Sequence, residues 1–148
     1  MVVAIVVSLL ALGLAAAAFF KPQRDAAPAA PQYSDKQVAD AKKNVCDAYT
    51  LAHRATTDAG TLSSEDPNQK FMISLNTRLA FSTAADHLLA AAIKYPEAPI
   101  NVLDASRNLA FSYQRIVLAQ TATASHDELE PLYADSDNAV AQVEKACG

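Results

Sequence analysis

Two cysteines and three histidines are the residues of this chain best suited to redox, metal or nucleophilic chemistry. Cys46 lies within a helical pattern, and Cys147 is the penultimate residue. No residue pattern supplies a base for either thiol, so the sequence does not favour a nucleophilic cysteine. Two interpretations remain open: a disulfide between Cys46 and Cys147, or two buried, unpaired thiols that pack as small apolar residues.

The histidines are His53, His87 and His126, and no two of them lie within one helical turn of each other. Metal sites on helices need spacings such as His-x-x-x-His or Glu-x-x-His. We therefore expect surface or interfacial histidines, no metal site and no cofactor. The three glycines are too far apart for a phosphate-binding loop, and a G-x-S-x-G elbow is absent from the sequence. The sequence predicts no catalytic residue, and we expect that the protein is not an enzyme.

Charge and composition narrow the classes of partner. The net charge is −4, and no basic surface is present to displace counterions from phosphates, so we expect no nucleic-acid binding. Residues 126–148 carry six acids and one base. The favoured interpretation is a solvated helix face whose first turn suits acids; the alternative is an acidic docking face for a basic partner.

The elements that position these residues are predicted to be helices, because alanine makes up about a fifth of the chain and favours helix over strand. Capping boxes at Ser34–Gln37 and Ser125–Glu128 predict two helix starts. Asp66 followed by Pro67 predicts a third start, and Gly60 is a natural residue just past a helix end. The expected helices are 35–59, 67–94, 100–121 and 126–147, and Pro131 is expected to kink the last one or delay its start.

Apolar residues recur at helical spacing in all four segments. With short connections, this pattern predicts an all-α fold, an antiparallel four-helix bundle. Four aromatic residues at helical positions are expected in its core, although a bundle with many small residues could also open a lipid-sized cavity among them. They are Tyr49, Phe81, Phe111 and Tyr113. The expected seam of the first helix is Val38, Ala41, Val45, Ala48, Ala52, Ala55 and Ala59. The third helix is expected to contribute, among others, Leu109, Tyr113, Ile116 and Leu118.

Residues 1–20 are apolar and uncharged, long enough to span a bilayer. We predict three parts: a transmembrane anchor at 1–20, with a secretory signal peptide as the alternative, a Pro/Ala-rich spacer at 21–33, and a helical bundle domain at 34–148. Lys21 and Arg24 follow the apolar run, and taken alone they place the domain in the cytoplasm.

The cysteines favour the opposite orientation. In an up-down-up-down bundle the last helix ends near the start of the first, so Cys147 meets Cys46 if the last helix stops about three turns along the first. Such a bond persists outside a reducing cytoplasm. We therefore expect a disulfide and a domain on the extracytoplasmic side of the cytoplasmic membrane.

Several segments resemble a mycobacterial-type family of alanine- and proline-rich membrane proteins of unknown function. The resemblance rests on Tyr33–Lys42, Val45-Cys46, Ala48-Tyr49, His53, Asn76–Ala80, Leu109-Ala110, Tyr113-Gln114 and Cys147. It implies a cell-envelope protein with paired cysteines and carries over no catalytic residue. Those proteins often have a longer Pro-rich stretch ahead of the membrane helix, which this sequence lacks.

The sequence thus predicts a membrane-anchored helical domain that acts as an interaction or structural protein of the cell envelope. Its expected partners are the membrane and an unknown envelope protein or lipid. The alternative function is a carrier or sensor of a lipid or other apolar ligand.

Overall fold

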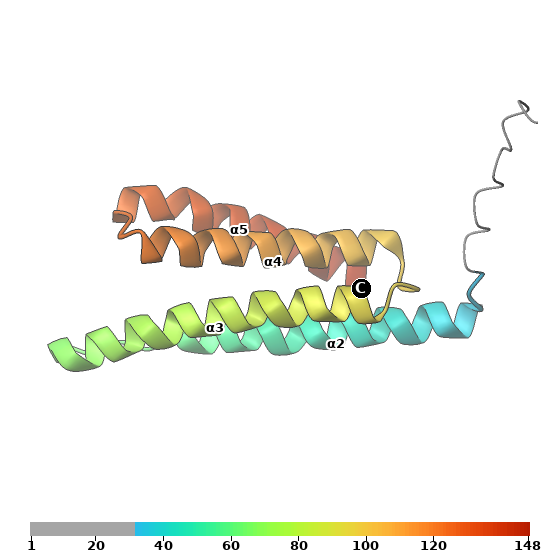
Figure 1. Ribbon diagram of the computed structural model, residues 1–148, viewed down its shortest axis with the longest axis horizontal. Coiled ribbons are helices and arrows are strands. Elements are labelled where there is room, and N and C mark those ends of the chain that lie inside the picture. Colours follow the sequence, from blue (N-terminus) through green and yellow to red (C-terminus); the bar gives the residue numbers. More distant parts are fainter. Residues whose placement is uncertain (1–31) are drawn as a thin grey trace, which may run out of the picture. The chain divides into compact units, whose positions relative to one another are not determined.

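The computed structural model describes residues 32–148, and in that part the chain forms four helices and no strand (Figure 1). They are α2 (Asp35–Gly60), α3 (Pro67–Lys94), α4 (Ile100–Thr121) and α5 (His126–Cys147). Short loops join them, and successive helices run in opposite directions (Figure 1). The prediction of an all-α domain with four packed helices is confirmed.

The predicted membrane segment 1–20 lies outside the described residues, as does the spacer 21–33 except for its last two residues. Between residues 32 and 148, none of the helices combines the length and the apolar character that crossing a bilayer requires. Residues 33–148 form a compact unit of their own.

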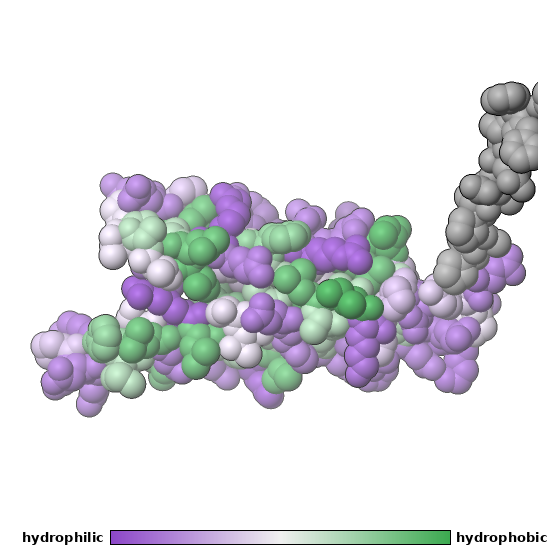
Figure 2. Space-filling model, in the orientation of Figure 1, coloured by the Kyte–Doolittle hydropathy of each residue, from purple (hydrophilic) through white to green (hydrophobic). Residues whose placement is uncertain are grey.

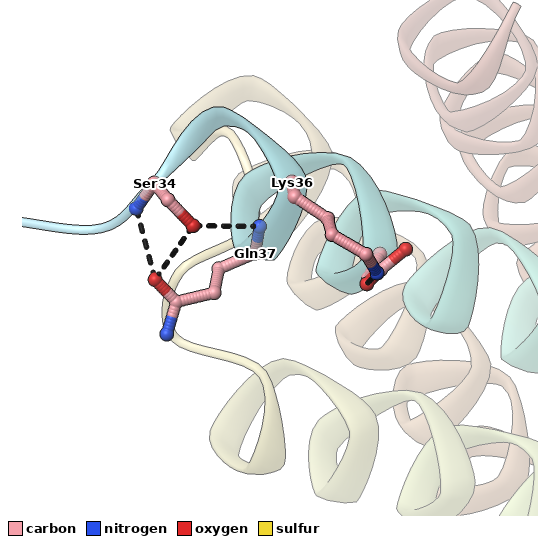
Figure 3. Close-up of polar contacts among 4 residues, drawn as sticks. Ser34, Lys36 and Gln37 are labelled. Atoms are coloured by element: carbon pink, nitrogen blue, oxygen red, sulfur yellow. Dashed lines mark hydrogen bonds and ion pairs between the residues drawn. The ribbon is translucent and has the colours of Figure 1, made fainter.

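Side-chain caps decide where α2, α3 and α5 begin. The Ser34 hydroxyl accepts a hydrogen bond from the Gln37 amide at 3.3 Å, and the Gln37 side chain accepts one from the Ser34 amide at 2.9 Å (Figure 3). One turn further, Lys36 forms an ion pair with Asp40. Ser125 and Glu128 form the same reciprocal pair at the start of α5. Both predicted capping boxes are confirmed, and each satisfies two amides that a helix start leaves without partners.

The start of α3 is also as predicted. Asp66 accepts hydrogen bonds from the amides of Asn68 and Gln69 at 2.8 and 3.0 Å. Pro67 occupies the first helical position, where its missing amide proton has no consequence.

Two local expectations, a helix end before Gly60 and a delayed start of α5 at Pro131, are wrong. Gly60 is the last residue of α2 and does not have a positive φ, because Thr61 caps the helix with an ordinary right-handed conformation. In the part of the chain that the structure describes, the positive φ belongs to Thr123, at 60°, in the loop before α5. Pro131 does not delay the start of α5, which begins five residues earlier at His126. A proline this close to a helix start removes one internal hydrogen bond and leaves most of the ladder intact.

The core consists of two apolar clusters rich in alanine, whose small side chains let the helices approach closely. The larger cluster joins all four helices around Leu88, Leu109 and Tyr113. The smaller cluster lies at the end where α2 begins and contains Val45, Val102 and Leu103. Together the two clusters hold most of the domain's buried apolar side chains.

Two core assignments need correction. In α2 the buried seam passes through Thr56, whereas the predicted seam residue Ala55 is exposed. The other predicted seam residues from Ala41 to Ala59 are buried, so the correction concerns the single position at which Thr56 takes the place of Ala55. In α4, Leu118 is 68% exposed, and Phe111 is also exposed, because both lie on the face away from the neighbouring helices.

The helices do not pack equally with all their neighbours. α2 lies along α3, α3 along α4, and α4 along α5, whereas α2 and α5 contact each other much less extensively. The bundle is therefore tight on three of its sides and more open on the side between α2 and α5.

Candidate functional site

The Cys46–Cys147 pair joins α2 to the end of α5. The two Cα atoms lie 5.8 Å apart, and the structure pairs the sulfur atoms as a disulfide. Both cysteines are half-buried and pack against the smaller apolar cluster. The predicted disulfide pairing is what the structure contains, and it closes a loop between residues 101 positions apart.

One turn from this pair, a second link connects the same two helices. The Tyr49 hydroxyl donates a hydrogen bond to Glu144 Oε1 at 3.2 Å. Burial, followed by the negative charge of Glu144 and its hydrogen bond, raises the pKa of Tyr49 to about 12. The phenol is therefore a neutral donor at physiological pH, and it stabilises the contact between α2 and α5 just inside the disulfide.

Beyond Tyr49, the side between α2 and α5 is hollowed into a cleft of about 120 Å³. All four helices contribute to its walls. The lining residues are His53, Thr56 and Thr57 from α2, Phe81 from α3, Tyr113 from α4, and Tyr133, Ser136, Asp137 and Val140 from α5. We call this feature the α2–α5 cleft.

Three aromatic side chains in contact with one another form part of the cleft wall. The rings of Phe81 and Tyr113 meet edge to face with centroids 5.0 Å apart, and Phe81 lies 6.4 Å from Tyr133. Two hydrogen bonds hold the phenols: Tyr113 shares one with the Thr56 hydroxyl at 3.3 Å, and Tyr133 accepts one from Gln120 at 2.7 Å. Such mutual packing limits the motion of all three rings.

The Tyr113 phenol also experiences the charge of Asp137. Burial raises the pKa of Tyr113, the hydrogen bond with Thr56 opposes this rise, and the negative charge of Asp137 adds to it. The carboxylate of Asp137 therefore acts on the phenol across the cleft. Within residues 32–148, Asp137 has no ion-pair partner, whereas its neighbour Asp135 pairs with Arg115 at 3.0 Å.

The three histidines belong to three different helices, and one of them, His53, lines the α2–α5 cleft. His53 is half-buried and stacks on Tyr49 with ring centroids 5.5 Å apart. Its Nδ1 atom is buried and has no hydrogen-bond partner among the described residues. His87 and His126 are exposed. Across residues 32–148, no three His, Cys, Asp or Glu side chains are grouped closely enough to hold a metal ion.

A second feature lies on the outer side of α2 and α3. A groove of about 320 Å³ between the two helices is lined mainly by apolar and small residues, among them Leu51, Ala55, Leu79 and Ala80. Figure 2 shows that hydrophobic side chains gather over the N-terminal half of α3, at the end of the domain away from residue 33. The exposed large apolar residues here are Leu51, Leu62, Phe71, Met72, Leu75 and Leu79, which we call the α3 apolar face.

The α3 apolar face is well exposed: Phe71 and Leu79 each retain more than 60% of their accessible surface. Because α3 has 28 residues and α4 has 22, the first turns of α3, which carry Phe71 and Met72, extend past the end of α4. Leu79 lies within the length that α4 accompanies and is exposed beside the groove between α2 and α3.

The α2–α5 cleft was not predicted from the sequence. Its signal was the interruption of two apolar seams by polar residues, Thr56 in α2 and Ser136 in α5, both of which are buried. The sequence did not show that the two interruptions would face each other. Comparisons of the chain with protein families, with curated proteins and with solved structures find no significant match in any of the three. The resemblance to alanine- and proline-rich mycobacterial-type membrane proteins therefore stays a prediction.

Proposed function

We propose that the protein is a membrane-anchored, extracytoplasmic helical domain that acts as an interaction or structural protein of the cell envelope. The apolar run at residues 1–20 supports anchoring. The Cys46–Cys147 pair supports an oxidising location. The proposal assigns no catalytic role to any side chain.

The α3 apolar face is the observation that carries the interaction role. Contiguous exposed apolar side chains on a small domain commonly mark a binding site for another protein. Phe71, Leu75 and Leu79 are spaced four residues apart, and Met72 lies three residues before Leu75, so the four side chains share one face of α3. This spacing and the adjoining groove suit an amphipathic helix of another envelope protein, laid along α3 with its apolar side inward.

Photo-crosslinking in living cells tests this proposal. A photoreactive residue replaces Leu75 in the full-length chain, and a second version replaces Ile93, which is 77% exposed near the other end of α3. We expect one discrete protein adduct from position 75 and none from position 93. Leu79→Gln should reduce the adduct at least fivefold, whereas Ile93→Gln should leave it unchanged.

The adduct's mass identifies the occupant. An adduct of twice the chain's mass assigns the face to a second copy and supports the structural version of the role. A heterologous adduct that depends on Leu79 supports a distinct envelope partner. The absence of an adduct from position 75 contradicts the proposal.

A carrier or sensor of a lipid or other apolar ligand is the second candidate function. The observation in its favour is the groove between α2 and α3, whose apolar lining suits an acyl chain. Ala55→Leu narrows this groove, and Ala39→Leu is the matched control on the same helix outside it. If lipid that co-purifies with the full-length chain falls with Ala55→Leu and persists with Ala39→Leu, the carrier function is supported. Equal lipid content in both variants opposes it.

A further inference from the structure

The α2–α5 cleft combines an aromatic wall with a single unpaired carboxylate. The aromatic side chains are Phe81, Tyr113 and Tyr133, and the carboxylate belongs to Asp137. The three aromatic residues come from three different helices, α3, α4 and α5, and hydrogen bonds hold both phenols in place. The walls are therefore preorganised by the fold.

The negative charge of the cleft determines which sign of charge a ligand should carry. Among the acids of α5, Asp135 pairs with Arg115, and Glu144 accepts the hydrogen bond from Tyr49. Asp137 has neither kind of partner in the part of the chain that the structure describes. Asp137 lines the cleft and remains exposed to solvent, and its negative charge contributes to the raised pKa of Tyr113. An anion entering the cleft would meet this carboxylate, whereas a cation would be attracted by it.

The size and the aromatic lining of the cleft further restrict the class of ligand that fits it. A volume of about 120 Å³ is of the order of an engineered cavity that accepts benzene, so the cleft suits a compact group. Aromatic rings attract ammonium groups through their quadrupoles, most strongly where the site is partly desolvated. His53 Nδ1 and the Ser136 hydroxyl add polar atoms to the same walls.

We propose that the α2–α5 cleft binds a small organic ammonium group, held by the aromatic side chains of Phe81, Tyr113 and Tyr133 and by the carboxylate of Asp137. The site is separate from the α3 apolar face and does not depend on the proposed function. Two sources present this chemistry: a soluble alkylammonium compound, and the headgroup of a zwitterionic lipid.

Titration with choline tests the proposal. The full-length chain is prepared in maltoside micelles with labelled phenylalanine and tyrosine rings, and the aromatic NMR resonances are followed at neutral pH. We expect choline to shift the resonances of Phe81, Tyr113 and Tyr133 together, with one dissociation constant. The neutral carbon isostere of choline should bind at least fivefold more weakly, because it lacks the charge.

A matched pair of variants links the effect to the cleft. Asp137→Asn should weaken choline binding about fivefold, the scale of one partly exposed charge contact. Asp135→Asn, on the same helix but paired with Arg115, should change it less than twofold. No shift of the three rings, equal binding of the isostere, or equal effects of both variants overturns the proposal.

Lipid nanodiscs separate the two sources. A headgroup ligand predicts that phosphatidylethanolamine shifts the three ring resonances in the full-length chain, whereas phosphatidylglycerol does not. A soluble ligand predicts the same ring positions in both nanodiscs and a choline-induced shift in each. If neither the headgroup nor choline moves the rings, the cleft binds no ammonium group and the proposal is wrong.

Discussion

Removal of the Cys46–Cys147 bond should cost the domain a large part of its stability. The bond closes a loop between residues 101 positions apart, and the chain-entropy model assigns such a loop about 4.7 kcal/mol. A domain of this size is typically stable by about 5–15 kcal/mol. The double variant Cys46→Ser/Cys147→Ser should therefore lose roughly a third or more of the free energy of unfolding.

The assay is urea unfolding of residues 33–148, a compact unit, followed by circular dichroism. We expect the variant to lose about 4 kcal/mol and roughly 15–20 °C in melting temperature. The urea dependence of unfolding should steepen, because the unfolded chain without its cross-link exposes more surface.

Chemically reduced wild-type protein is the control for the two introduced hydroxyls. It should lose the same free energy of unfolding as the double variant. A loss below about 1 kcal/mol in both samples, with an unchanged urea dependence, would refute the reasoning, since the loop-closure term would then be absent.

Three further predictions concern single side chains. Tyr49→Phe removes the hydrogen bond to Glu144 and should cost about 1 kcal/mol in urea unfolding at neutral pH. The pKa of Tyr49 is about 12 in the folded domain and 10.0 for a free tyrosine, so the folded state holds the phenol proton more tightly. This contribution to stability is therefore complete below pH 10 and is lost as the pH rises toward 12. Tyr49→Phe should flatten the fall in the free energy of unfolding between pH 10 and 12, and an unchanged fall in the variant would count against the raised pKa. Leu88→Ala, at a fully buried position, should lower the free energy of unfolding by about 2–5 kcal/mol. Leu79→Ala, on the exposed face, should change it by no more than about 0.5 kcal/mol. Equal losses of stability in thermal unfolding would contradict the exposure of Leu79. Ser125→Ala removes the capping hydroxyl of α5 and should lower the stability of this helix start by about 1 kcal/mol. Amide hydrogen exchange in the first turn of α5 should become faster, and unchanged exchange there would contradict the cap.

The features that the sequence predicted well are local ones. A capping box needs only four consecutive residues, so Ser34–Gln37 and Ser125–Glu128 predicted two helix starts without knowledge of the fold. The cysteine pairing was predicted from the order of the helices in an up-down-up-down bundle and from the expected export of the domain, on the condition that α5 stops about three turns along α2.

The features that it missed depend on neighbouring helices. Leu118 fits an apolar pattern, but its burial depends on which face of α4 the neighbouring helices cover, and the pattern does not contain that information. The choice of Thr56 over Ala55 for the seam depends on the rotation of α2 about its axis, which packing against α3 and α4 determines. The α2–α5 cleft needs side chains from all four helices, so no single segment indicates it.

The central claim is a domain that is exported, oxidised and still attached to its N-terminal anchor. The most direct test is the non-reducing intact mass of the protein extracted from the envelope after alkylation of free thiols. We expect the full-length mass without alkyl groups, which requires an uncleaved residue 1–20 segment and a closed Cys46–Cys147 bond. A full-length chain carrying two alkyl groups would mean reduced thiols and a cytoplasmic domain, and it would contradict the proposed location and the disulfide together.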